Sequence, residues 1–240
     1  MTTLCVDCGN TRLKWGLRAA GRWLAADALA IADAQRLGEV LPQAPSRLVA
    51  CNVAGAAVDA QLEALAGRFG VPLLRVRAQA RACGVSNGYD EPSQLGADRW
   101  AALIGARALH GGPCLVVNAG TATTIDVLDG DGVFKGGLIL PGLDLMRASL
   151  ARSTAGLPLA QGGFRDLPRN TDDAIASGCL SATLGAIERM FRRSADAPSS
   201  LCLLSGGASG SLVGALTIPH REIPNLVLEG LARIAEDESQ

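Results

Sequence analysis

Two stretches of this chain share one local design: Leu4-Cys-Val-Asp-Cys-Gly-Asn-Thr-Arg-Leu-Lys-Trp-Gly-Leu17 and Leu115-Val-Val-Asn-Ala-Gly-Thr-Ala-Thr-Thr-Ile-Asp-Val-Leu128. Each has an apolar run, a polar residue, a glycine two positions later, a hydroxyl residue and a second extended run. This order predicts a strand, a tight turn and a returning strand. Glycine lets backbone approach a phosphate closely, and turn N–H groups with threonine hydroxyls can bind its oxygens. Two such hairpins predict a duplicated fold that holds nucleotide phosphates between its halves.

The segments around each hairpin predict two related α/β halves with mixed sheets. After the first hairpin come a third strand, a helix, a strand, a helix over Ala56–Phe69 and another strand. A strong helix then runs from about Asp98 to Leu109, and the breaker cluster His110-Gly-Gly-Pro113 ends this half. We therefore predict domains at 1–110 and 111–240.

The second half begins in the same manner, with a hairpin and a third strand over Val133–Leu140. A long helix over Thr171–Phe191 follows, and Thr171 is its predicted N-cap. The segment Leu203-Leu-Ser-Gly-Gly-Ala-Ser209 is a strand that ends in a glycine pair. It is either a place where adenine or ribose lies against backbone, or an ordinary turn.

Composition excludes several classes of protein. The chain has 240 residues, of which 48% are hydrophobic and 19% charged, as in ordered globular proteins. Its formal net charge is −1 and it has no basic block, which disfavours nucleic-acid binding. No apolar stretch reaches the roughly 18–20 residues of a membrane span, and Asp7 comes too early for a secretory signal. The seven cysteines suit reduced thiols, so we expect a cytoplasmic protein.

Asp7 stands at a strand end beside a Gly-Asn-Thr turn. A carboxylate there can hold Mg²⁺ directly or through water, while the turn N–H groups meet phosphate. The alternative is a plain hairpin in which Asp7 and Asn10 only satisfy the turn. Recurrence of the pattern at Gly120-Thr121 favours phosphate, and we expect Thr121 to face a ligand. The β-propensity of threonine is the competing explanation for the second hairpin.

Gly96-Ala-Asp-Arg-Trp100 opens the helix that runs to Leu109. In the first turn the helix dipole favours an ionised Asp98, which can accept a proton from an attacking hydroxyl. The residues alone favour a simpler role, in which Asp98 is the N-cap. Arg99 is either a surface cation or a group that grips a substrate carboxylate.

In their order along the chain, these motifs resemble the type III pantothenate kinase family. This family belongs to the acetate kinase/actin-like kinases and phosphorylates vitamin B5 at the start of coenzyme A synthesis. Asp7–Lys14 resembles its first phosphate motif, and Tyr89 with Gly96-Ala-Asp-Arg99 resembles its pantothenate motif. The second phosphate motif and later family positions are matched by Asn118–Asp126, Gly136-Gly137, Pro141-Gly142, Asn170-Thr171, Ser177-Gly178 and Ser205-Gly-Gly207.

The resemblance implies two ribonuclease H-like (actin-like ATPase) domains around a central cleft, a homodimer, and ATP-dependent phosphorylation of pantothenate. Asp98 would be the catalytic proton acceptor, and Asp7 would position Mg²⁺ with ATP. The pantothenate site would comprise Tyr89, Gly96, Ala97, Asp98, Arg99 and Thr171, the last reaching across the dimer interface. The ATP site would comprise Asp7, Cys8, Gly9, Asn10, Thr11, Arg12, Leu13, Lys14 and Thr121.

The chain departs from this family at one position. Many members have Asp where this chain has Asn118, and that Asp helps to bind an activating K⁺ or NH₄⁺. Because Asn offers only a neutral oxygen, we expect no strong dependence on a monovalent cation.

Two alternatives from other classes remain. The first is a non-catalytic regulatory or accessory protein on the same fold, and the second is an actin-like kinase for a sugar, acetate or polyphosphate. Retention of Asp7, Asp98, Arg99 and Thr121 favours an active kinase over a scaffold, because a scaffold needs none of these side chains. The fold by itself does not separate these functions.

Overall fold

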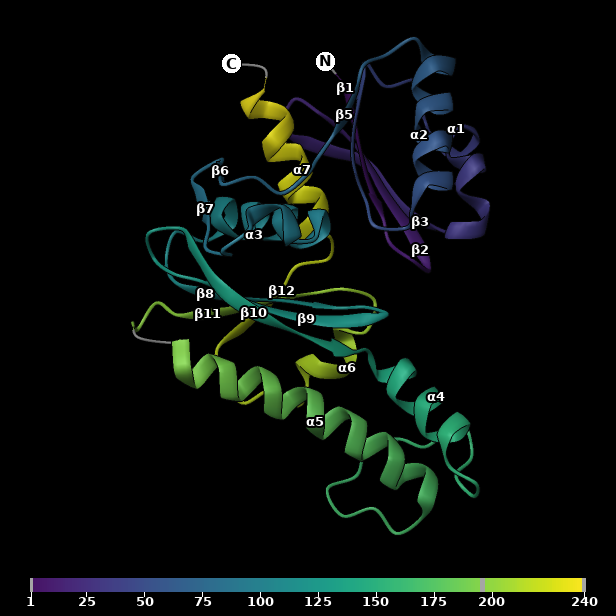
Figure 1. Cartoon of the computed structure of the whole chain (residues 1–240), viewed down its shortest axis with the longest axis vertical. Coiled ribbons are helices and arrows are strands. Elements are labelled where there is room, and N and C mark those ends of the chain that lie inside the picture. Colours follow the sequence, from purple (N-terminus) through teal and green to yellow (C-terminus); the bar gives the residue numbers. More distant parts are fainter. Residues whose placement is uncertain (1, 195–196, 239–240) are drawn as a thin grey trace. The chain divides into compact units, whose positions relative to one another are not determined.

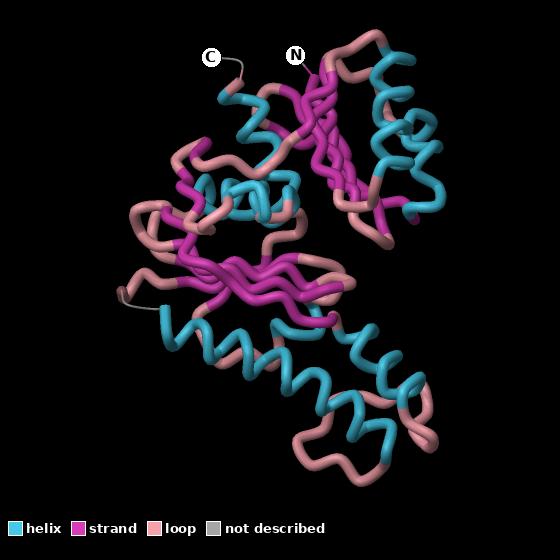
Figure 2. Tube along the Cα trace, in the orientation of Figure 1, coloured by secondary structure: helices cyan, strands magenta, loops and turns pink. Residues whose placement is uncertain are grey.

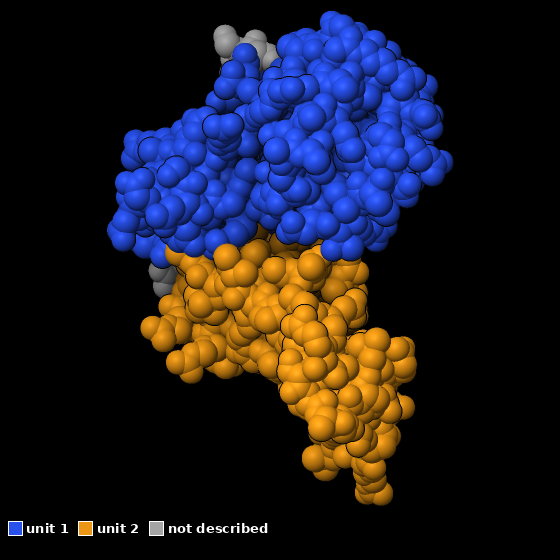
Figure 3. Space-filling model, turned by 45° about the vertical axis from the view of Figure 1, so that its right-hand side comes forward, with its two compact units in different colours: residues 1–111, 132–135, 225–240 blue, residues 112–131, 136–224 orange. Residues whose placement is uncertain are grey.

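The computed structural model describes residues 2–194 and 197–238. Its contacts group the chain into two units (Figure 3). Unit 1 comprises Met1–Gly111, Gly132–Lys135 and Asn225–Gln240, and unit 2 comprises Gly112–Asp131 and Gly136–Pro224. None of the described helices is both long and apolar enough to cross a membrane.

Unit 1 holds the strands β1 (Thr2–Cys8), β2 (Arg12–Ala19), β3 (Arg22–Ala30), β4 (Arg47–Asn52), β5 (Leu73–Arg75), β6 (Arg81–Ala82) and β7 (Val85–Asn87) (Figure 1). Its helices are α1 (Leu37–Val40), α2 (Ala56–Phe69), α3 (Ala97–Leu109) and α7 (Leu226–Asp237), with 3-10 turns at Ile31–Arg36 and Pro92–Gln94. Unit 2 holds β8 (Cys114–Ala119), β9 (Ala122–Leu128), most of β10 (Val133–Pro141), β11 (Leu201–Ser205), β12 (His220–Glu222), α4 (Leu143–Ser153), α5 (Thr171–Ser194) and α6 (Gly210–Val213).

The two units repeat one sheet topology, as the paired hairpins predicted. Unit 1 has the strand order β3-β2-β1-β4-β5, and unit 2 has the corresponding order β10-β9-β8-β11-β12. The hairpins β1–β2 and β8–β9 are antiparallel, whereas β4 joins β1, and β11 joins β8, in parallel. The glycine turns of the two hairpins therefore occupy equivalent positions in the two sheets.

Strand alternation divides the residues of β1 between the two faces of the unit 1 sheet. Leu4, Val6 and Cys8 pack into a core with α1 and α2, which lie beside the sheet in Figure 2. Cys5 and Asp7 take the opposite face, where α7 packs on β1 and α3 packs on β4. Cys5 and Cys8 thus face away from each other, and all seven cysteines are free thiols.

The last helix, α7, groups with unit 1, although the predicted division placed it in domain 111–240. Glycines allow α7 and α3 to approach backbone to backbone. A Cβ at Gly230 would lie 1.8 Å from the Ala101 carbonyl oxygen, and one at Gly105 would lie 2.4 Å from the Leu226 carbonyl oxygen. Gly132–Lys135 also groups with unit 1, where Val133 and Phe134 pair in parallel with Ser86 and Asn87 of β7.

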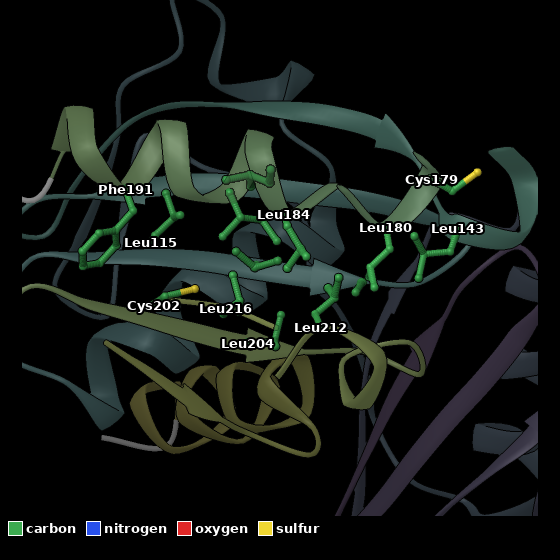
Figure 4. Close-up of a cluster of buried hydrophobic side chains, with 14 of the residues drawn as sticks. Leu115, Leu143, Cys179, Leu180, Leu184, Phe191, Cys202, Leu204, Leu212 and Leu216 are labelled. Carbon is green, nitrogen blue, oxygen red and sulfur yellow. The ribbon is translucent and has the colours of Figure 1, made fainter. Parts of the chain in front are cut away.

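The core of unit 2 lies between its sheet and α5 (Figure 4). Leu115 and Val117 of β8 meet Leu180, Leu184 and other apolar residues of α5 there. Side chains alternate between the two faces of a strand, so Asn118, which lies next to Val117 in β8, faces away from this core.

Several local predictions differ from the structure. The segment predicted as a helix near 32–41 forms a 3-10 turn followed by four α-helical residues. The strands β6, β7 and β12 are only two or three residues long, too short to show an alternating pattern. The predicted N-cap Thr171 is the first residue of α5, and the side chain of Asn170 does the capping, accepting the Asp173 N–H at 2.8 Å.

Candidate active-site residues

Asp7 is a buried carboxylate at the end of β1, with a side chain that is 7% exposed. In the sheet it lies between Lys14 of β2 and Cys51 of β4. The Cys51 thiol donates a hydrogen bond to Oδ1 of Asp7 over 3.5 Å. Burial raises the pKa of Asp7 to about 6, against the opposing effect of Lys14, and the carboxylate of Asp98 raises it further. Unit 1 therefore brings Asp7, Lys14 and Asp98 within electrostatic reach of one another.

The turn after Asp7 presents backbone and polar side chains to solvent. Gly9 N–H donates to the Arg12 carbonyl over 3.1 Å, and Asn10, Thr11 and Arg12 are exposed. The side chains of Cys8 and Leu13 belong instead to the core. Those two predicted ATP-site residues can therefore offer a ligand only their backbone.

Asp98 is the second residue of α3 and is therefore not its N-cap. The N-cap is Gly96, which has no side chain to cap with, and Oδ1 of Asp98 accepts the N–H of Arg99 over 2.8 Å. The N-cap explanation of Asp98 is therefore wrong. A Cβ at Gly96 would lie 2.6 Å from Oδ1 of Asp98, so glycine leaves room for the carboxylate beside the half-buried Ala97.

Arg99 is buried, at 6% exposure, which contradicts the prediction of a surface cation. Its Nη1 donates to the hydroxyl of Tyr89 over 3.0 Å. Its guanidinium carbon lies 5.7 Å from the centre of the Tyr89 ring and 5.8 Å from that of Phe134. Asn87 holds the loop that carries Tyr89, because it accepts the Tyr89 N–H over 3.1 Å and donates to the Pro92 carbonyl over 3.1 Å.

Phe134 is a contact that the sequence did not reveal. It precedes the predicted glycine pair in β10, and nothing in its local pattern separates it from other core aromatics. Only the pairing of β10 with β7 places it beside Tyr89, at 5.1 Å between ring centres.

In unit 2, three glycines allow backbone segments to meet at the turn of the second hairpin. A Cβ at Gly142 would lie 2.1 Å from the Gly120 carbonyl oxygen, and one at Gly206 would lie 2.2 Å from that of Ala119. One at Gly137 would lie 2.1 Å from Oδ1 of Asp126. This corner joins the segments predicted as the second phosphate motif to the glycine pair after β11, and leaves Thr121 exposed.

Asn118 lies next to this corner and pairs in register with Thr124 of β9 and Ser205 of β11. Its Oδ1 atom is buried and has no hydrogen-bond partner among the described residues. A buried carbonyl oxygen of this kind is a neutral acceptor that a small cation would satisfy. No three His, Cys, Asp or Glu side chains within 2–194 and 197–238 are grouped to hold a metal ion.

Thr171 is exposed at the start of α5 and lines an open hollow of about 770 Å³ within unit 2. Leu150 of α4, Leu157 and Arg169 of the following loop, and Ile175 of α5 also line it. Thr171, Thr121 and Asn118 belong to unit 2, whereas the other predicted site residues belong to unit 1.

Comparison with known proteins gives consistent matches over most of the chain. The family model described as type III pantothenate kinase matches residues 3–193. A type III pantothenate kinase of Aromatoleum aromaticum is 53% identical over 98% of this chain and 98% of its own length. One of an Azoarcus species is 52% identical over 97% of this chain and 90% of its own length.

Among solved structures, a conserved putative Baf family transcriptional activator from Campylobacter jejuni is similar, with a TM-score of 0.66 and 19% identity over 98% of both chains. A putative 2-dehydro-3-deoxygalactonokinase from Sinorhizobium meliloti has a TM-score of 0.63 at 18% identity, also over 98% of both chains. At these identities the likeness concerns the fold alone. Together with the repeated sheets, it confirms the expected α/β fold of two ribonuclease H-like, actin-like domains.

Proposed function

We propose a function on one premise, that the chain belongs to the type III pantothenate kinase family. The protein transfers the γ-phosphoryl group of ATP to the primary hydroxyl of pantothenate, giving 4′-phosphopantothenate for coenzyme A synthesis. The observation that carries this function is 53% identity, over 98% of both chains, to a kinase of that name.

The first hairpin turn is the proposed ATP site, together with Thr121 of the second. The turn Gly9–Arg12 supports this role, because Asn10, Thr11 and Arg12 are exposed at the strand end, where turn N–H groups can bind phosphate oxygens. Lys14 supplies a positive charge at the same strand end. Mg²⁺ bound with ATP neutralises phosphate charge, and Asp7 fits as its holder because a cation would relieve the cost of burying an ionised carboxylate.

Asp98 is the proposed general base. It is half-exposed in the first turn of α3. Asp98 follows the N-cap Gly96, so the N-cap position does not account for it, although its Oδ1 accepts the first-turn N–H of Arg99. Asp7 suits the role less well, because its carboxylate is buried beside Cys51.

Arg99, Tyr89, Gly96 and Ala97 are the proposed pantothenate site within unit 1. The Arg99–Tyr89 hydrogen bond supports this grouping, and a guanidinium is the natural partner of the carboxylate of pantothenate. Thr171 is proposed to complete the site of a second copy of the chain.

A homodimer is therefore part of the proposal. Exposed apolar side chains in the loop before α5 support it: Leu159 is 56% exposed, Phe164 42% and Leu167 87%. Light scattering during gel filtration should give the mass of a dimer, and Leu167→Asp should shift it towards the monomer. A monomeric wild-type protein would refute the shared site.

The proposed location of the protein is the cytoplasm.

A coupled assay of ADP release with pantothenate tests the function, and Asp98→Asn tests the base. The variant should lose turnover by about 10²–10⁴-fold, the usual contribution of general base catalysis, with ATP binding nearly unchanged. Asp27→Asn is the matched control, since its carboxylate also accepts the N–H of the next residue, over 2.7 Å, at an exposed position. Near-normal turnover in Asp98→Asn would remove Asp98 from the mechanism.

A regulatory protein on the same fold remains the second candidate, because the similar Campylobacter jejuni structure is described as a putative transcriptional activator. The same assay separates the two. ADP release that requires pantothenate identifies a kinase, and its absence favours the regulatory function.

A further inference from the structure

We propose that Phe134 is a positioning residue for the pantothenate site, acting through Arg99. Its ring packs against the ring of Tyr89, and both rings lie within cation–π reach of the guanidinium of Arg99. The inference rests on the proposed function and adds a residue from outside the predicted motifs.

Arg99, Tyr89 and Phe134 form a cluster of three side chains within unit 1. The guanidinium carbon of Arg99 lies 5.7 Å and 5.8 Å from the ring centres of Tyr89 and Phe134, within the range of cation–π attraction. The two rings are 5.1 Å apart and tilted by 49°, as in favourable aromatic pairs. The hydrogen bond from Nη1 of Arg99 to the Tyr89 hydroxyl, 3.0 Å long, orients the guanidinium.

Backbone contacts fix the Phe134 ring in place. Phe134 is 0% exposed and pairs with Asn87, the residue whose side chain holds the Tyr89 loop. A Cβ at Gly88 would lie only 2.1 Å from the Phe134 carbonyl oxygen, so β10 lies directly against this loop. The position of the Phe134 ring is thereby tied to that of the loop that carries Tyr89.

Holding an arginine side chain in place lowers the cost of binding an anion. An arginine side chain has several rotatable bonds, and ordering it on binding costs affinity unless it is already held. The two rings and the hydroxyl of Tyr89 restrict Arg99 before the substrate arrives. A guanidinium is a suitable partner for a carboxylate. Phe134 should therefore affect the affinity for pantothenate more than turnover or the affinity for ATP.

Phe134→Leu tests this role, because it keeps an apolar side chain and removes the ring. We expect KM for pantothenate to rise about 10-fold, with kcat and KM for ATP within about twofold of wild type. Phe191→Leu is the control, since it removes a buried ring from the core of unit 2 and should leave KM for pantothenate unchanged. Calorimetric titration with pantothenate should show the same loss of affinity, and thermal unfolding checks that both variants fold.

A double-mutant cycle separates positioning from a general packing effect. In an Arg99→Met background, Phe134→Leu should change KM for pantothenate by less than about twofold, because its effect passes through the missing guanidinium. Equal losses in both backgrounds, or an unchanged KM in Phe134→Leu, would overturn the inference. If Phe134→Leu does not fold, Phe134→Met fills the space with a flexible side chain and takes its place. Wild-type protein without pantothenate-dependent turnover would refute the proposed function instead.

Discussion

At the scale of single residues, the ionised form of Asp7 is destabilised by burial. Its carboxyl group is buried between two strands, and its pKa is raised from 3.8 to about 6, chiefly by burial. The folded protein therefore carries a cost near neutral pH that a bound cation would relieve. Such costs are common where charge is needed for function.

Replacing Asp7 by Asn should stabilise the ligand-free protein near neutral pH. Below the unfolded pKa of 3.8, both states hold the proton and Asp7 makes little difference to stability. As pH rises towards 6, the unfolded state releases the proton first, so stability falls across this window by roughly 3 kcal/mol at most.

Thermal unfolding at several pH values measures this effect. Asp7→Asn should melt above wild type near pH 7.5, by up to about 10 °C, and close to it near pH 4. The exposed Asp27→Asn should show no such dependence. A constant difference between Asp7→Asn and wild type at all pH values would contradict the assignment of this titration to Asp7.

Asn118→Asp should create or strengthen activation by K⁺ or NH₄⁺. The buried Oδ1 of Asn118 has no hydrogen-bond partner among the described residues. It is therefore an oxygen that could bind a cation, but it carries no negative charge. A carboxylate there adds a full negative charge for the cation. Titration of activity with KCl at constant ionic strength should show a steeper rise in the variant, and identical curves would refute the prediction.

At the scale of elements, the start of α5 depends on Asn170. Its Oδ1 accepts the Asp173 N–H over 2.8 Å, and its Nδ2 donates back to Oδ2 of Asp173 over 2.9 Å. The bond from Asn170 Nδ2 and one from Gly163 N–H lower the pKa of Asp173. The cap therefore joins the helix to the loop that precedes it.

Asn170→Ala should lower the free energy of unfolding by about 1 kcal/mol, the usual value of an N-cap. Thr171→Ala is the matched control and should change it by less than about 0.5 kcal/mol, because Thr171 is the first helical residue rather than the cap. Chemical denaturation of both variants measures the difference. A larger loss of stability in Thr171→Ala than in Asn170→Ala would mean that Thr171 is the N-cap, as predicted from the sequence.

At the scale of the whole molecule, unit 1 is built from distant parts of the chain. Its helix α7 buries five large apolar side chains, those of Leu226, Val227, Leu228, Leu231 and Ile234. At about 1.5–3 kcal/mol for each, this burial is of the same order as the total stability of a domain.

A chain that ends at Pro224 should therefore fail to form a stable unit 1, although every predicted ATP-site and pantothenate-site residue remains. We expect loss of cooperative unfolding and of ATP binding, measured by calorimetry. A chain that ends at Asp237 is the control and should behave as wild type. A stable, ATP-binding product of the shorter truncation would show that α7 is dispensable.

The sequence by itself determined the repeated hairpins, the long helices and the family, because glycine turns, strand patterns and helix periodicity are local signals. The helix bounds Ala56–Phe69 were predicted to the residue. Asp98 illustrates the limit: a motif shows which residue is present, but capping depends on where the helix begins.

Only the tertiary structure decided which distant residues meet. Phe134 reaches Arg99 through the pairing of β10 with the three-residue strand β7, and α7 reaches α3 through two glycines far apart in the chain. Burial likewise set the pKa of Asp7 and removed Arg99 from the surface. Such properties depend on what packs around a side chain, and local sequence carries no record of that.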